Sequence, residues 1–254
     1  MNDLKNYKTI KEKYDKKGWI LIKKIFSKKE INEINKVIDN FLKKKINKYK
    51  GKDINYIDSN KNINSINSFH SLADSNFIKK KSKNKKIVKI VKNLLASKPQ
   101  YIASELFAKP ASKGLPSPLH QDNYYWCVKG GNALTVWVAL DNASSRNGGL
   151  RYYNSSHQLG VVDHEPSYAK GSSQKVSNIK KYNKFTQTCP KLSPGDALFH
   201  HSEIIHGSNA NKSGMRRRGL TFQYKDFKAK YDTILKKRYL SSLKKQIVLR
   251  NKEK

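Results

Sequence analysis

The sequence predicts a mainly β fold, a jelly-roll sandwich of short strands flanked by helices at both ends of the chain. Apolar residues first recur at helical spacing. Short apolar runs, separated by glycine, proline and asparagine turns, then follow. A chain of 254 residues is long enough to bury the core of one domain. We therefore expect a single domain over residues 1–254, with a helical part at 1–98, a jelly-roll core at 99–225 and a C-terminal helix at 226–254.

The N-terminal part is expected to be mostly helical. Ser27 and Glu30 have the spacing of a capping box, in which each side chain bonds the other residue's backbone. Apolar side chains recur behind them with the period of a helix. The expected helices are residues 3–17, 28–44 and 84–96. A short strand at residues 19–22 and a polar, asparagine-rich loop at residues 45–68 complete this part.

The core is expected to consist of short strands. Val136 and Val138 alternate with Thr135 and Trp137, the pattern of a strand with two different faces. Asparagine and glycine at residues 147–149 give a turn between two further strands. The expected strands are residues 101–108, 120–122, 134–140, 197–200, 204–208 and 220–224.

One long connection, residues 154–190, is rich in serine, glycine and lysine. Loops of this length in compact domains often act as lids or binding loops. We therefore expect a mobile lid in this segment, around the tract Gly171-Ser172-Ser173.

The formal net charge is +34, which is compatible with binding to nucleic acid or to a membrane surface. The basic residues are 46 lysines against 7 arginines, and asparagine and isoleucine are also abundant. These three residue types share codons rich in A and T, so genome composition explains the excess. The lysines are scattered rather than gathered in a patch with aromatic residues, so we expect no nucleic-acid partner.

The chain gives few signals for a compartment other than the cytoplasm. Its first residues are polar, with no apolar core of a signal peptide. No apolar run approaches the roughly twenty residues needed to span a bilayer. Cys127 and Cys189 are the only cysteines, which does not suit a disulfide scaffold. A cytoplasmic protein is therefore expected, and nothing in the sequence indicates its oligomeric state.

His120 and Asp122 form a His-x-Asp pair in an expected strand. Residues i and i+2 of a strand point the same way, so both side chains are expected on one face. Two imidazoles and one carboxylate are the ligands of non-haem Fe(II) oxygenases, where they leave three coordination positions open. The third ligand can come from any distant strand that packs nearby. The pair alone is a weak signal, because His201-Ser202-Glu203 offers the same ligand types.

An ordered series of motifs supplies the missing context. After the His-x-Asp pair come a Gly-Asp turn, a short apolar run, a His-Gly-Ser motif at His206, and Arg217, eleven positions later. This series resembles the phytanoyl-CoA dioxygenase (PhyH) family of Fe(II)/2-oxoglutarate-dependent oxygenases. The matching pieces are Leu106-Phe107-Ala108-Lys109-Pro110, His120-Gln121-Asp122, Trp137-Val138-Ala139-Leu140-Asp141, Asn147-Gly148-Gly149-Leu150, Ser155-Ser156-His157, Pro194-Gly195-Asp196 and His206-Gly207-Ser208.

The resemblance covers most of the chain and implies the double-stranded β-helix, the cupin-like form of the jelly roll. It places the family's iron ligands on His120, Asp122 and His206, and its 2-oxoglutarate arginine on Arg217. The implied cofactors are Fe(II), 2-oxoglutarate as cosubstrate and O2. The chain departs from the family at one turn, Asn-Ser-Ser-His in place of the usual Pro-Gly-Ser-His.

Arg217 offers a planar fork that matches a carboxylate and stays charged when buried. On a strand, Arg216 and Arg218 point to the opposite face, so one parity alone can serve the pocket. The residues leave that parity open, and the resemblance selects Arg217. Ser208 shares the parity of His206 and is expected to donate to the same carboxylate.

Three aromatic residues and one lysine complete the expected site. Tyr124 and Trp126 share the parity of His120 and would line the substrate pocket, although packing inside the roll explains them equally well. Trp137 is a similar case, on the cosubstrate side. Lys109 would meet an anionic substrate or cosubstrate, although a solvated side chain is the more ordinary role in so lysine-rich a chain. The remaining histidines of the core, His157, His164, His200 and His201, are not expected to bind metal.

The expected function is an Fe(II)- and 2-oxoglutarate-dependent dioxygenase that hydroxylates an unactivated C–H bond of a small molecule, with succinate and CO2 as co-products. An iron halogenase on the same fold would need a small residue where Asp122 stands. A Zn hydrolase with the same three ligands would leave Arg217 without a role. A non-catalytic binding module for polyanions would need neither the three metal ligands nor Arg217. No motif selects the substrate.

Overall fold

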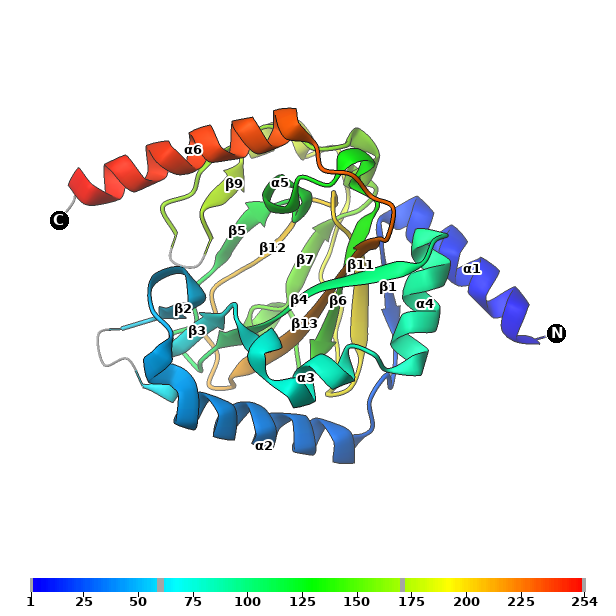
Figure 1. Ribbon diagram of the computed structural model, residues 1–254, viewed down its shortest axis with the longest axis horizontal. Helices are drawn as coiled ribbons and strands as arrows, with labels where there is room; N and C mark the ends of the chain where they lie inside the picture. The colour runs from blue at the N-terminus through cyan, green and yellow to red at the C-terminus, as the bar shows by residue number, and fades with distance from the viewer. Residues whose placement is uncertain (1, 59–61, 170–171, 253–254) are drawn as a thin grey trace.

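The computed structural model describes residues 2–58, 62–169 and 172–252. Two antiparallel sheets enclose a cavity between them, and helices cover the outside (Figure 1). The major sheet has the order β1-β11-β6-β13-β4-β3-β2. Its strands are β1 (Trp19–Ile22), β11 (Ala197–His201), β6 (Ala133–Ala139), β13 (Arg217–Asp226), β4 (Pro99–Lys109), β3 (Ile66–Phe69) and β2 (Ile54–Tyr56).

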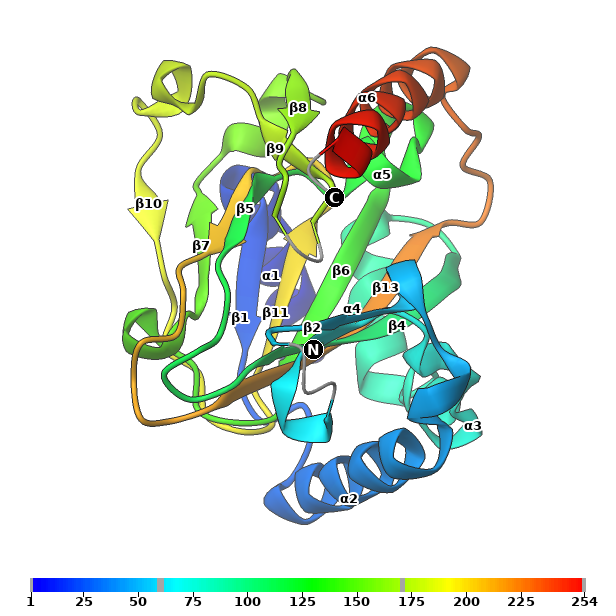
Figure 2. The same cartoon turned by 90° about the vertical axis from the view of Figure 1, so that its left-hand side faces the viewer.

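The minor sheet has the order β10-β7-β12-β5 and faces the major sheet across the cavity (Figure 2). Its strands are β10 (Gln187–Thr188), β7 (Leu150–Tyr153), β12 (His206–Ser208) and β5 (Ser117–His120). A separate antiparallel hairpin is formed by β8 (His164–Pro166) and β9 (Gln174–Val176). This two-sheet arrangement is the jelly roll that the sequence predicts.

The helices lie outside the two sheets, with α2 and α6 on opposite sides of the molecule (Figures 1 and 2). They are α1 (Asn2–Lys17), α2 (Lys28–Lys45), α3 (Asn76–Lys81), α4 (Lys85–Leu95), α5 (Asn123–Trp126) and α6 (Thr233–Lys252). The predicted capping box starts α2: Ser27 accepts from the backbone of Glu30, and Glu30 accepts from the backbone of Ser27. No helix of the described residues is long and apolar enough to cross a membrane.

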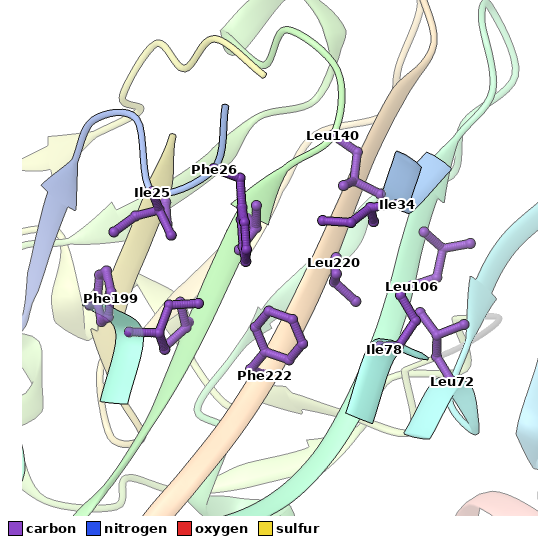
Figure 3. Packing of buried hydrophobic residues seen from close by; sticks show 14 of the residues in the cluster. Ile25, Phe26, Ile34, Leu72, Ile78, Leu106, Leu140, Phe199, Leu220 and Phe222 are labelled. Carbon is purple, nitrogen blue, oxygen red and sulfur yellow. The ribbon is translucent and has the colours of Figure 1, made fainter. Parts of the chain in front are cut away.

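The main core lies between the major sheet and helices α2 and α4. Every second residue of β6 and β13 points into it, among them Val136 and Leu220. From α2, Ile34 and Ile38 are fully buried against them. Figure 3 shows Leu220 and Phe222 in this layer beside Ile34. Because this face of the sheet takes the aliphatic residues, the alternate residues are left to face the cavity.

The N-terminal part is not only helical. It contributes β1, β2 and β3 to the major sheet, and the predicted loop over residues 45–68 contains two of them. Among the described residues of this range there are also three short 3-10 segments, namely Ile46–Lys48, Gly51–Asp53 and Ile63–Ser65. Strands of three or four residues carry almost no periodicity, and β3 pairs with β4, which lies far along the chain. The loop prediction was therefore wrong.

The predicted strand over residues 120–122 is also wrong at its end. Strand β5 ends at His120, and Asp122 has helical φ and ψ angles of −59° and −37°. The backbone N–H groups of Tyr125 and Trp126 both donate to the carbonyl of Asp122, which starts α5. A local helical turn therefore replaces strand pairing directly after the first histidine.

Three other boundaries differ from the predictions. Strand β12 begins at His206. Ile204 lies before it in a turn, where its backbone N–H donates to the carbonyl of His201. The long connection 154–190 contains the β8–β9 hairpin and strand β10 rather than an unstructured loop. The C-terminal helix, expected over residues 226–254, runs from Thr233 to Lys252 among the described residues.

Candidate metal centre

The cavity between the sheets is lined by those residues of the core strands that alternate with the buried aliphatic ones. On β6 these are Thr135 and Trp137, and on β13 they include Arg217 and Thr221. Gly219 lies between those two β13 residues, and a Cβ there would stand 2.0 Å from the indole of Trp137. The glycine therefore lets the indole lie against the sheet. The space between these side chains, including the part open to solvent, is about 580 Å³.

His120, Asp122 and His206 converge in this cavity. Their ligand atoms all lie within 4.8 Å of one another, and they form the one group of this kind among the described residues. The Nε2 atoms of His120 and His206 lie 3.5 Å and 3.7 Å from Oδ1 of Asp122. The two histidines are direct partners on paired strands β5 and β12. Asp122 joins them from the first turn after β5, not from the strand itself.

Each histidine presents the nitrogen that a metal needs. Nδ1 of His120 donates to the carbonyl of Pro118 at 2.8 Å. Nδ1 of His206 donates to the carbonyl of Ile204 at 3.0 Å. A proton held on Nδ1 leaves the lone pair of Nε2 free, and Nε2 is the atom aimed at Asp122. The donor set and its orientation therefore fit a divalent ion held by two imidazoles and one carboxylate.

Asp122 is held by residues outside the three ligands. Thr135 donates its hydroxyl to Oδ2 of Asp122 at 2.7 Å, and Nε2 of His200 lies 3.3 Å from the same oxygen. The hydroxyl of Tyr152 lies 2.9 Å from Nδ1 of His200, so it donates there while His200 donates to the carboxylate. These contacts occupy Oδ2 and leave Oδ1 for a metal ion.

The charges of the centre suit metal binding. Burial opposes ionisation of Asp122, but the imidazoles of His206, His120 and His200 hold its pKa well below the usual value. Burial and the neighbouring His120 lower the pKa of His206 to about 3, so that this ring is neutral. The His120 pKa is raised by Asp122 despite burial, and a metal ion would displace that proton.

Arg217 lies in the same cavity and is 1% exposed. Its Nε and Nη2 donate to the carbonyl of Gly148, and Nη1 donates to that of Phe107 at 3.4 Å. A guanidinium has five N–H groups, so about two remain for a ligand. Burial lowers the Arg217 pKa to about 9, which still leaves it charged at neutral pH. Arg217 thus points into the cavity, on the side of the strand expected for it. Arg218 points the opposite way, toward α2, and bonds Asp39 at 2.6 Å.

Ser208 and Trp137 border the same region. Both line the cavity, and Cζ of Arg217 lies 5.4 Å from the centre of the Trp137 ring. The Ser208 hydroxyl is buried and has no hydrogen-bond partner. Buried hydroxyls are normally bonded, so this one is available for a bound ligand.

Lys109 lines the cavity but is buried, contrary to the solvated alternative. Its ammonium donates to the carbonyls of Leu115 and Asn209, the latter at 2.8 Å. Burial and the nearby Arg217 lower the Lys109 pKa to about 6. At neutral pH the guanidinium is therefore the charged group at this end of the cavity.

Tyr124 and Trp126 lie elsewhere than expected. Both belong to α5 and neither lines the cavity, because the chain turns into a helix where a strand was predicted. The ring of Tyr124 stacks on His164 at 4.1 Å. Their neighbour Tyr125 instead meets His120 edge-on, with ring centres 5.9 Å apart.

The alternative ligand group His201-Ser202-Glu203 does not converge. The ring of His201 packs against His157, and Glu203 accepts a hydrogen bond from Asn123 at 2.8 Å. Sequence reasoning missed Thr135, His200 and Glu105, which all line the cavity. Strand alternation on 134–140 and 197–200 was a signal for the first two, but it could not tell which face held the metal.

Comparisons with known proteins agree with this arrangement. The family model of phytanoyl-CoA dioxygenase (PhyH) matches residues 14–219. A probable phytanoyl-CoA dioxygenase of Caenorhabditis elegans is 28% identical over 83% of this chain and 72% of its own length. A probable alpha-ketoglutarate-dependent hypophosphite dioxygenase of Stutzerimonas stutzeri is 28% identical over 56% of this chain. That match covers only 50% of the bacterial protein.

Solved structures share the fold. The epimerase SnoN, in complex with Fe3+, alpha ketoglutarate and nogalamycin RO, has a TM-score of 0.73 at 19% identity over 90% of this chain and 87% of its own. EctD from S. alaskensis with bound Fe has a TM-score of 0.72 at 22% identity, covering 88% of this chain and 78% of that one. These likenesses confirm the cupin-like jelly roll. The chain belongs to the phytanoyl-CoA dioxygenase (PhyH) family of iron- and 2-oxoglutarate-dependent dioxygenases.

Proposed function

We propose that this chain hydroxylates an unactivated C–H bond of a small molecule, and that His120, Asp122 and His206 hold the Fe(II) it uses. The observation that carries the proposal is the convergence of these three side chains with both Nε2 atoms free. When bound, iron with 2-oxoglutarate and O2 supplies the oxidising chemistry, with succinate and CO2 as co-products.

The far carboxylate of 2-oxoglutarate is assigned to Arg217 and Ser208. Arg217 has unused N–H groups in the cavity, and the Ser208 hydroxyl lacks a partner. Trp137 forms the wall beside the guanidinium. A fixed guanidinium and a hydroxyl together orient a carboxylate better than a mobile lysine would. Because its pKa is lowered, Lys109 lines the cavity largely uncharged and is not the main partner of the 2-oxoglutarate carboxylate.

The two sheets contribute by excluding water from the cavity. His206 is 4% exposed and Trp137 is 2% exposed. Thr135 and His200 fix the carboxylate of Asp122, so the ligand set needs little rearrangement when a metal ion enters.

The rival functions each leave an observation unexplained. A halogenase needs an open position where the carboxylate of Asp122 points at the two histidines. A Zn hydrolase gives no role to the buried Arg217. A polyanion-binding module gives no role to the three converging ligands or to Arg217, because it would need only surface lysines.

The test is succinate formation by purified protein with Fe(II), 2-oxoglutarate and O2, in the presence of a panel of small molecules. A substrate should stimulate succinate release and appear with one added oxygen atom. Consumption of 2-oxoglutarate that never depends on Fe(II), or a substrate that is cleaved by water instead, would refute the proposal.

A further inference from the structure

We propose that Glu105 is the substrate anchor, and that it selects a small polar molecule carrying an N–H or O–H donor rather than a fatty acyl chain. The inference rests on the proposed function, because it needs a substrate site beside the iron. It concerns the part of the cavity that lies away from Arg217, along strands β4 and β13.

Strand register places Glu105 between the two ends of the site. Glu105 of β4 is the partner of Thr221 on β13, and Thr221 is in turn the partner of Trp137 on β6. The next row toward the metal pairs Gln223 with Thr135, the residue that bonds Asp122. Glu105 therefore shares one face of the major sheet with Trp137 and with Thr135, which bonds Asp122, and it lines the same cavity.

The Glu105 carboxylate is oriented but not saturated. Nδ1 of His70 donates to Oε1 at 2.9 Å, and Nε2 of Gln223 donates to Oε2 at 2.9 Å. A carboxylate has about four acceptor sites, so roughly two remain. The side chain is 19% exposed, which leaves those sites open to the cavity. His70 is itself held through Nε2 by Ser68 at 3.0 Å, so the carboxylate has a rigid support.

The residues that bond or pair with Glu105 are polar. Thr221 is its partner on β13 and Gln223 bonds its carboxylate, whereas Phe107 is its apolar neighbour on β4. An alkyl chain in this space would cover hydrogen-bonding groups without replacing their bonds to water, and each such loss costs free energy. A substrate with its own donor replaces those bonds instead.

Charge favours the same class of ligand. Among the described residues that line the cavity, the carboxylates are those of Asp122 and Glu105. The first faces the two histidines of the metal centre. Glu105 is thus the carboxylate left for the substrate, where a protonated amine would form a charge-assisted bond and a hydroxyl a weaker one. A substrate carboxylate at this position would be repelled.

The experiment uses the full chain with Fe(II) and 2-oxoglutarate in the absence of O2, where a probe bound beside the metal perturbs the visible absorption of the complex. Four probes share a five-carbon chain: pentylamine, pentanol, pentanoate and pentanoyl-CoA. We expect the amine and the alcohol to bind, with pentanoate and pentanoyl-CoA at least about tenfold weaker, the scale of one hydrogen bond to a charged group.

Glu105→Gln keeps the shape of the side chain but removes its charge. It should weaken pentylamine about tenfold and pentanol less, because the amide oxygen still accepts from a hydroxyl. Glu105→Asp shortens the side chain and serves if the first variant unfolds. The matched control is Glu203→Gln, a buried carboxyl that bonds Asn123 and does not line the cavity. It should leave all four probe affinities unchanged.

Affinity for 2-oxoglutarate should stay the same in all variants. Equal or tighter binding of pentanoate or pentanoyl-CoA than of pentylamine would overturn the inference. So would binding of neither donor probe, or a Glu105→Gln variant that binds pentylamine as wild type does. If wild-type protein forms no complex with Fe(II) and 2-oxoglutarate, the proposed function itself fails, and this outcome is visible before any probe is added.

Discussion

Asp122 owes its orientation to side chains that no motif contains. Thr135 and His200 come from strands β6 and β11, and both contact Oδ2. The other oxygen, Oδ1, faces the two histidine ligands. Such supporting contacts set the geometry of a metal ligand and typically change metal affinity by about 10- to 100-fold when removed.

Thr135→Val should therefore weaken Fe(II) binding by about tenfold or more while the fold is kept, because valine has the same shape and lacks the hydroxyl. The measurement is an anaerobic Fe(II) titration against a competing chelator. Thr233→Val, at the exposed start of α6, is the matched control and should bind Fe(II) as wild type does. Equal affinity in both variants would remove Thr135 from the metal centre.

Arg217→Lys should raise the 2-oxoglutarate requirement roughly ten- to hundredfold, because lysine keeps the charge and loses the fork; this corresponds to about 1.5–3 kcal/mol for a charged hydrogen bond. Fe(II) affinity should stay near normal. The measurement is a 2-oxoglutarate titration at fixed Fe(II).

The two neighbouring arginines give controls of different kinds. Arg216 is 54% exposed beside Asp141, so Arg216→Lys should change little. Arg218 bonds Asp39 and Asn35 under α2, so Arg218→Lys should lower the unfolding midpoint and leave 2-oxoglutarate affinity intact. A large loss of 2-oxoglutarate affinity in either control, with none in Arg217→Lys, would contradict the assignment.

At this scale the sequence could indicate which four side chains meet in the cavity, because their order along the chain resembles that of the family. It could not indicate how Asp122 reaches the metal. The expected strand parity was wrong for Asp122, which lies in a helical turn, and equally for Tyr124 and Trp126. The turn depends on backbone hydrogen bonds to the carbonyls of Asp122 and Gln121, which the alternation of polar and apolar residues does not predict.

Among the elements, β13 joins the end of the cavity that holds Arg217 to the end that holds Glu105. Gly219 allows Trp137 to lie across it, since an added Cβ would meet the indole at 2.0 Å. Gly219→Ala should push the indole away, lower stability by about 1–3 kcal/mol and weaken 2-oxoglutarate binding. The measurement is urea unfolding together with a 2-oxoglutarate titration. Gly214→Ala is the control, because nothing lies within 4 Å of its added carbon.

The connection 154–190 remains the predicted lid. Its hairpin contacts the site through Tyr125, whose hydroxyl lies 3.3 Å from Ser172 and 3.2 Å from the carbonyl of Gln174. Gly171, in the tract expected to be mobile, lies outside the described residues. Hydrogen exchange in β8 and β9 should slow when substrate and 2-oxoglutarate are added without O2. Unchanged exchange there would count against a lid.

Element prediction succeeded where one face of the element is apolar over several turns or alternations. Helices α2 and α4 and strand β6 meet that condition, and all three lie close to their expected ranges. Strands β2 and β3 do not, because they have only three and four residues, and the other partner of β3 is the later strand β4.

For the whole molecule, buried neutral histidines predict a loss of stability in mild acid. Burial lowers the pKa of His164 to about 4 and that of His201 to about 3. Between these pKa values and the unfolded value of about 6.5, the unfolded chain binds protons that the folded chain does not. The unfolding free energy should therefore fall as pH drops below about 6.5, by at most about 1.4 kcal/mol per pH unit for each histidine.

His70 acts in the opposite direction. Burial opposes its protonation, but Glu105 raises its pKa above the ordinary value, so its contribution is present below about 6.5 and is lost as pH rises through the folded value. Urea unfolding at several pH values, with His201→Asn as the comparison, separates these contributions. The variant should show a shallower decline in acid, and an equal slope would contradict the role given to His201.

The central claim is that one Fe(II) and one 2-oxoglutarate bind together in the cavity between the two sheets. The most direct measurement is anaerobic equilibrium binding of both to wild-type protein and to Asp122→Ala. We predict one Fe(II) per chain, 2-oxoglutarate binding that strengthens when the metal is present, and loss of tight Fe(II) binding in the variant, which lacks the anionic ligand. Metal binding that survives Asp122→Ala, or 2-oxoglutarate affinity that does not depend on metal, would contradict the account.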